Sequence, residues 1–86
     1  MSNTTYKKAG KLFAVHHGDY AGQMFALVTI EEHNYNFLSM PEMKNISVSV
    51  KDFDRGIKKE IIQFVEALPK DIFKVIKAQY EKNSNN

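Results

Sequence analysis

The sequence lacks several residue types that commonly carry chemistry or cross-link small folds. It has no cysteine and no tryptophan, and only two prolines and four glycines among its 86 residues. Without cysteine, the chain cannot form disulfides, use a thiol nucleophile or bind zinc through thiolates. The absence of cysteine also fits a reducing compartment, and we predict a cytoplasmic protein.

Long apolar segments are missing too. The first apolar cluster, residues 12–15, is far shorter than the apolar region of a signal peptide. No stretch approaches the roughly 18 consecutive apolar residues expected of a membrane-spanning helix. We therefore expect a soluble protein without a membrane partner.

The chain also lacks a strong excess of one charge. Its net charge is +2, and residues 1–50 are neutral, with four lysines and four acidic residues. The excess lies in residues 51–86, which carry eight basic and six acidic residues. Nucleic-acid-binding proteins usually show a denser basic stripe, because their affinity comes from neutralised phosphates. This weak bias favours a solvated helix surface over a nucleic-acid site.

The apolar residues that are present suffice for one small core. Hydrophobic residues make up 43% of the sequence, and they include six phenylalanines and four tyrosines. That share is typical of a globular chain, and the length predicts a single domain over residues 1–86. The polar ends, residues 1–9 and 83–86, are expected to be flexible tails.

Four strand-like runs occupy the first half of the chain. They are residues 11–17, 24–31, 35–40 and 46–50. The second run is almost continuously apolar, which predicts a strand buried on both faces. Pro41 should end the third run, because proline cannot donate into a sheet ladder. In the fourth run the alternation directs Val48 to the core and Ser47 to water.

After residue 50 the apolar period changes from 2 to 3.6, which predicts two helices, over residues 57–68 and 70–82. The apolar stripe around the first helix comprises Phe53, Ile57, Ile61, Phe64, Val65 and Leu68. Pro69 separates the helices and is well placed to begin the second. The predicted fold class is α+β, a four-stranded antiparallel meander followed by two C-terminal helices.

Two arrangements of these elements fit the pattern. One is a flat sheet with both helices on one face, and the other is a strongly bent SH3-like small barrel with the helices at one end. The first two strands carry apolar residues on both faces, which favours the barrel-like form.

The polar turn between the first two strands carries a recognisable pattern. Residues 15–22, spelled VHHGDYAG, place two glycines around a polar residue and an aromatic residue, and an apolar run to Val28 follows. Residues 15–28 resemble the KOW motif of ribosomal proteins and transcription elongation factors. The resemblance covers about a sixth of the chain and implies an SH3-like small barrel. We also expect Gly18 or Gly22 to take a positive φ.

The turn region offers weak candidates for a metal or catalytic site. His16, His17, Asp19 and His33 could supply nitrogen and oxygen ligands, but their spacing matches no established metal pattern. No phosphate loop, dinucleotide motif or serine nucleophile signature occurs. We therefore predict no metal, no cofactor and no enzymatic activity.

Two binding interpretations follow from the aromatic and helical residues. Tyr20, Tyr35 and Phe37, with His33 nearby, could stack on exposed bases, as in RNA- or DNA-binding small barrels. The predicted helices carry apolar residues beyond the needs of one sheet face, among them Ile62, Phe73 and Val75, and this surplus favours a protein partner or a homodimer.

The sequence thus predicts a small non-enzymatic binding or adaptor module that acts through a protein–protein surface. The alternative is a KOW-like barrel that binds RNA or DNA. The candidate binding surface comprises His17, Asp19, Tyr20, His33, Tyr35, Ile62, Phe73 and Val75.

Overall fold

The computed structural model describes residues 9–85 and confirms the α+β class. The elements are β1 (Lys11–Val15), β2 (Met24–Ile30), β3 (Asn34–Met40), β4 (Lys44–Ser49), α1 (Val50–Lys58), β5 (Ile62–Ala67) and α2 (Lys70–Ser84). The strands form one antiparallel sheet in the order β4-β3-β2-β1-β5. The predicted four-stranded meander is therefore confirmed, with a fifth strand added at its β1 edge.

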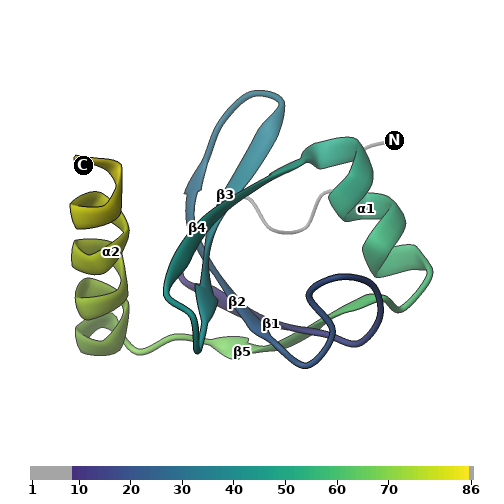
Figure 1. Cartoon of the computed structure of the whole chain (residues 1–86), viewed down its shortest axis with the longest axis horizontal. Coiled ribbons are helices and arrows are strands. Elements are labelled where there is room, and N and C mark those ends of the chain that lie inside the picture. Colours follow the sequence, from purple (N-terminus) through teal and green to yellow (C-terminus); the bar gives the residue numbers. More distant parts are fainter. Residues whose placement is uncertain (1–8, 86) are drawn as a thin grey trace.

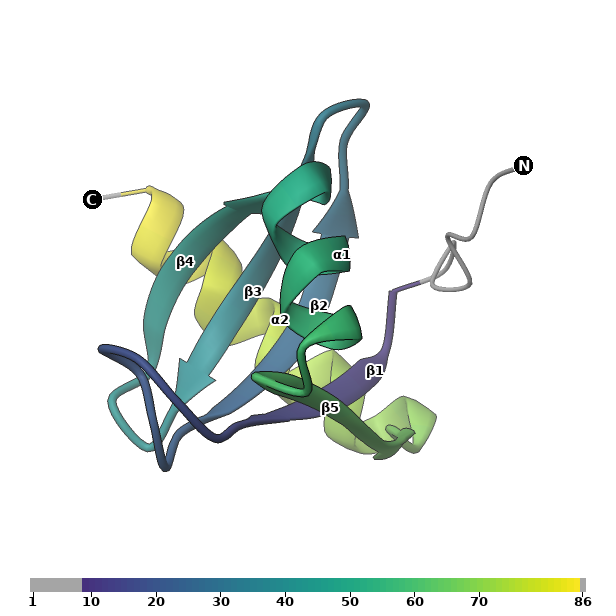
Figure 2. The same cartoon turned by 90° about the vertical axis from the view of Figure 1, so that its right-hand side faces the viewer.

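The sheet is bent, and the two helices cover opposite faces of it (Figures 1 and 2). Figure 2 shows α1 in front of the sheet and α2 behind it. The edge strands β4 and β5 do not pair with each other in residues 9–85, so the sheet bends without closing. The bent form is confirmed, but the prediction that both helices lie at one end or on one face is wrong.

The central strand β2 is buried on both faces, as predicted. Phe25 and Leu27 point toward α1, whereas Ala26 and Val28 point toward α2. All four are buried, because successive strand residues alternate between faces and each face carries a helix. Pro41 follows directly after the end of β3, also as predicted.

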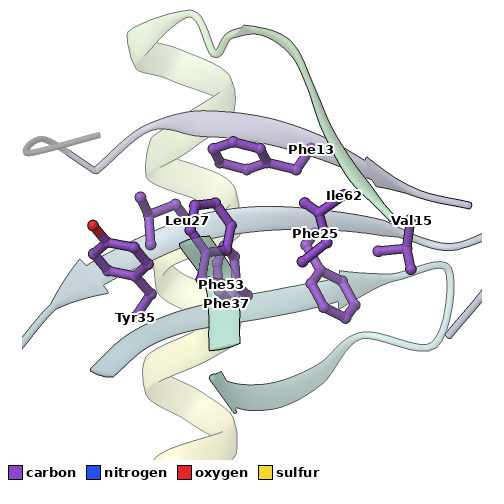
Figure 3. Close-up of a cluster of buried hydrophobic side chains, with 8 residues drawn as sticks. All are labelled: Phe13, Val15, Phe25, Leu27, Tyr35, Phe37, Phe53 and Ile62. Carbon is purple, nitrogen blue, oxygen red and sulfur yellow. The ribbon is translucent and has the colours of Figure 1, made fainter. Parts of the chain in front are cut away.

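The face of the sheet toward α1 holds an aromatic core (Figure 3). Phe53 of α1 reaches three rings of the sheet, with centroids 4.9 Å from Tyr35, 5.1 Å from Phe13 and 5.6 Å from Phe37. The contacts with Tyr35 and Phe13 are edge-to-face, a geometry favoured by the quadrupoles of aromatic rings. Ile46, Val48 and Val50 pack at the margin of this core.

Helix α1 begins seven residues before the predicted helix. Ser49 is its N-cap, and the Ser49 hydroxyl accepts a hydrogen bond from the Asp52 amide at 3.0 Å. Serine is among the best N-cap residues, because its side-chain oxygen satisfies an otherwise unpaired amide of the first turn. The predicted start at residue 57 is therefore wrong, and Phe53 belongs to the helix.

The same helix ends ten residues earlier than predicted. Glu60 has φ 61, and the Ile61 amide donates to the Gly56 carbonyl at 2.8 Å. A residue in the left-handed region with this six-to-one hydrogen bond is a Schellman end to a helix. The chain then reverses into β5, which pairs with β1, so the prediction of a helix through residue 68 is wrong.

Gly56 allows α1 and β5 to approach closely. A Cβ atom at this position would lie 2.8 Å from Ile62 Cδ1 and 3.2 Å from Ile62 Cγ1. Ile62 is only 8% exposed and belongs to the aromatic core. Because residue 56 has no side chain, the β-branched side chain of Ile62 can pack beneath the helix.

Helix α2 begins directly after Pro69, as predicted, and continues through Ser84. It packs across the other face of the sheet, where Ile76 joins the buried residues Ala26, Val28 and Leu38. Phe73 and Tyr80 are half-buried on the same side of the helix. The predicted C-terminal tail thus overlaps the helix at Asn83 and Ser84, and residues 1–8 of the predicted N-terminal tail lie outside the described residues.

The loop between β1 and β2 confirms the expected glycine conformations. Gly18 has φ 92 and Gly22 has φ 88, a region that residues with a side chain rarely adopt. The loop is closed by a hydrogen bond from the Gly22 amide to the Val15 carbonyl at 2.8 Å. His16 ties it to β5, because His16 Nε2 lies 2.9 Å from Gln63 Oε1.

Candidate functional site

A groove runs between α2 and the β3–β4 connection on the outer face of the sheet. It has a volume of about 390 Å³ and is lined by Leu38, Met43, Val75, Ile76, Ala78, Gln79 and Lys82. Leu38 and Ile76 are buried and form its floor, whereas Met43 is 45% exposed and Val75 is 70% exposed. The groove therefore has a fixed apolar floor and an exposed apolar rim.

Met43 projects into the groove from a hydrogen-bonded turn. Its amide donates to the Ser39 carbonyl at 2.7 Å, and its φ of 58 is left-handed. The Ser39 hydroxyl donates to the Lys44 carbonyl at 3.1 Å and accepts from the Lys44 amide at 3.3 Å. These bonds fix the backbone, while the unbranched thioether side chain of Met43 can adapt its shape to a bound group.

A network of side-chain amides fastens the last turns of α2 beside the groove. Asn83 Nδ2 donates to the Met43 carbonyl at 2.9 Å and to Asn45 Oδ1 at 3.0 Å. Asn45 Nδ2 donates to the Tyr80 carbonyl at 3.0 Å, and Gln79 Nε2 donates to Asn83 Oδ1 at 2.9 Å. The network links α2 to both β4 and the Met43 turn, so it holds the two walls of the groove at a fixed separation.

The charged residues of α2 lie on its solvent side. They are four lysines and two acids, Lys70, Lys74, Lys77, Lys82, Asp71 and Glu81. All six are exposed, and none of them takes part in an ion pair with another residue of the described range 9–85. Lys82 stands at the groove itself, so a partner with a carboxylate beside an apolar side chain would match this rim.

The structure does not bring the loop candidates into one site. His17, Asp19 and Tyr20 are exposed in the loop before β2. His33 follows β2, so it lies at the opposite end of a seven-residue strand, roughly 20 Å away. His33 has the exposed Glu32 carboxylate 3.8 Å away. The two histidine regions therefore cannot share a ligand.

The other predicted surface residues divide between core and groove. Tyr35 is buried among aromatic rings, and Ile62 is buried in β5 rather than displayed on a helix, so neither contributes to an exposed surface. Phe73 is half-buried, with its ring toward the Gly10 backbone. Only Val75 of this group lies on the rim of the groove.

Sequence reasoning missed Met43, Gln79 and Asn83. A signal for Asn83 existed, because it lies seven residues after Ile76 and therefore continues the buried side of α2. No comparable signal marked Met43, which meets α2 only through the tertiary fold. Residues distant in sequence form this groove, and no local pattern specifies such a pairing.

No group of three or more His, Cys, Asp or Glu side chains within residues 9–85 is arranged to hold a metal ion. No helix in that range combines the length and apolar character needed to cross a membrane. Comparison with protein-family models, with curated proteins and with solved structures found no match to this chain.

Proposed function

We propose that this protein is a small binding module that holds a protein partner in the groove along α2. The observation that carries the proposal is the exposure of Val75, at 70%, above a floor of buried apolar residues. Ile72, at 47%, and Met43, at 45%, extend the apolar surface on either side. Leaving large apolar side chains in water forgoes about 1.5–3 kcal/mol each, which a partner can recover by covering them.

The shape of the groove favours a protein segment. One wall is a helix and the other a hairpin turn, and such grooves accept an apolar face of an amphipathic helix. The partner should carry a carboxylate next to an apolar side chain, because Lys82 lines the groove together with Val75. In this proposal the module acts by binding rather than by catalysis, in the cytoplasm.

Nucleic-acid binding is the second candidate, and it is supported by one observation. Tyr20 is exposed in the loop that resembles the KOW motif, where its ring is available for stacking on a base. The Tyr20 and Phe25 ring centroids lie 5.5 Å apart, and the same loop carries Asp19, whose negative charge would repel phosphates. The groove is therefore the stronger candidate.

A pair of tagged variants tests both candidates in lysate from the protein's own host. Val75→Glu places a charge on the groove rim, and Tyr20→Ala removes the exposed ring at the other candidate site. We expect a protein that is retained by the wild type and by Tyr20→Ala but released by Val75→Glu. Retention should persist after nuclease treatment and should fall little between low and moderate salt.

Two results would contradict the proposal. Equal retention by the wild type and Val75→Glu would show that the groove is not the binding surface. Loss of retention with nuclease or with Tyr20→Ala would favour the nucleic-acid candidate, since phosphate-driven binding also weakens steeply with salt.

A further inference from the structure

The side of α2 that faces away from the sheet carries a short ordered stripe. Figure 1 shows α2 as an outer layer at one end of the molecule, with no other element beyond it. At about 100° per residue, Asp71, Val75, Ala78 and Lys82 fall on one side of the helix. All four are exposed. The stripe has an acid at its beginning, a base at its end and two apolar residues between them.

Two copies of this stripe are complementary when they run in opposite directions. Reversing the direction of the helix places the acid of one stripe opposite the base of the other. Asp71 and Lys82 have no ion-pair partner within residues 9–85, so both remain available for such a contact. The same reversal places Val75 opposite Ala78, a large residue against a small one, which is favourable for close helix packing.

We propose that the partner of the α2 surface is a second copy of this chain, bound at the rim of the groove through an antiparallel α2–α2 contact about a two-fold axis. The proposal rests on the proposed function, because it uses the same surface. In the dimer, Asp71 of each copy pairs with Lys82 of the other. A two-fold axis repeats every contact, so one chain supplies both halves of each pair.

The residues beside the stripe fit the same arrangement. A two-fold axis perpendicular to the paired helices keeps equivalent flanks on the same side. On one flank, Lys74 therefore lies about 3 Å along the helix axis from the level of Glu81 of the second copy, which places a further pair of opposite charges near each other. The other flank faces the groove. There, Ile72 of the second copy comes level with the end of the groove that Gln79 and Lys82 of the first copy line. The exposed Ile72 side chain is thereby covered.

The contact is small, and this sets the expected strength of the dimer. Helix α2 has 15 residues and is about 22 Å long. One helix pair buries less than the roughly 800 Å² per partner of a standard stable interface. The dimer should therefore be weak and dependent on protein concentration.

Charge reversal followed by sedimentation equilibrium tests the dimer. Lys82→Glu turns two attractive contacts into repulsive ones and should raise the dimer dissociation constant about tenfold. Asp71→Lys should act in the same way for the same reason. Lys77→Glu is the matched control, since it makes the same charge change on a side of α2 that faces away from the contact. It should leave the dissociation constant within a factor of about two.

Mixing the two charge-reversal variants provides the decisive experiment. A chain with Asp71→Lys and a chain with Lys82→Glu present complementary charges to each other at both symmetry-related positions. An equimolar mixture should form a heterodimer with about the affinity of the wild type, although each variant alone associates poorly. Circular dichroism verifies that both variants remain folded. A mixture that associates no better than its components would overturn the proposed register.

The outcomes separate this inference from the proposed function. A wild-type mass that stays near 9.9 kDa at every concentration, with a host protein still released by Val75→Glu, contradicts the dimer alone. A Val75→Glu protein that dimerises like the wild type, and that also retains a host protein like the wild type, contradicts the α2 surface and the proposed function with it.

Discussion

The two faces of the sheet are covered by helices in very different ways. Toward α1, the core consists mainly of aromatic rings from the sheet and the helix, and Phe53 is fully buried among them. Toward α2, the buried cluster is smaller, and Ile76 is the only buried residue of α2. Helix α2 instead leaves Ile72 and Val75 exposed.

Under the proposed function, this difference assigns stability to one face of the sheet and binding to the other. The larger cluster of buried apolar residues lies on the α1 side, and apolar burial is the main favourable contribution to folding. The α2 side is held by one buried isoleucine, half-buried aromatic residues and a network of amides. Its outer surface can therefore carry residues suited to a partner rather than to the core.

The largest effect should come from the aromatic core. Phe37→Ala removes a ring that contacts Phe13, Phe25, Tyr35 and Phe53. The cost should be about 3–5 kcal/mol of unfolding free energy, comparable to the whole stability of a small domain. Chemical denaturation measures it, with the half-exposed Ile72→Ala as control at less than about 1 kcal/mol. Similar losses for both variants would remove the contrast between the two faces.

A smaller effect is expected from the core beneath α2. Ile76→Ala should cost about 2–3 kcal/mol, toward the low end for a buried isoleucine, because the groove beside it lets the site relax. The loss should be local, so amide hydrogens of α2 should exchange faster while those of β2 and β3 keep their protection. Uniform loss of protection across the chain would show that the two layers unfold as one unit.

The amide network should contribute less again. Asn83→Ala removes hydrogen bonds to Met43 and Asn45 from a half-buried position and should cost about 1–2 kcal/mol. Asn85→Ala is the control, at an exposed residue outside this network. Thermal unfolding compares the two variants, and equal melting temperatures would mean that the network does not stabilise α2.

The smallest change should occur at the rim of the groove. Val75→Ser alters a residue that is 70% exposed and should shift stability by less than about 0.5 kcal/mol. The same substitution at the buried Val28 should cost several times more, because it buries a hydroxyl and leaves a gap. Parallel denaturation of the two valine variants checks this ratio, and a large loss at Val75 would mean that its side chain serves the fold rather than a partner.

The sheet could be predicted well from the sequence because its signals are local. Alternation in residues 46–50 and the apolar run of β2 indicate which side chains point into the core, without knowledge of the fold. The glycine pair at 18 and 22 likewise identified its loop, since glycine has no Cβ and readily adopts the positive φ that this loop requires.

The fifth strand escaped prediction because two signals conflicted. Apolar residues from Phe53 to Leu68 follow a helical period, although residues 61–65 are rich in the β-branched and aromatic types that favour strands. Helix α1 ends at Lys58, and Glu60, two residues later, takes a left-handed conformation that usually calls for glycine or asparagine. The only nearby glycine, Gly56, serves packing against Ile62 instead of the helix end.

The groove could be predicted only in part, since it depends on a tertiary contact. Val75 was identified from its place on an over-wide apolar face. Met43 and Asn45 approach α2 across more than 30 residues of sequence, as the hydrogen bonds to Asn83 and Tyr80 show. One isolated sequence contains no local pattern that specifies such a contact.

The pairing of β5 with β1 also has a consequence for the order of folding. The hairpins β1–β2, β2–β3 and β3–β4 join neighbouring segments, but Val15 and Ile62 are roughly 50 residues apart in the chain. Contacts that close long loops generally form late, because their entropic cost is incurred before they contribute energy. Strand β5 should therefore dock late, after the meander exists. Destabilising changes in β5 should then accelerate unfolding and leave the folding rate nearly unchanged.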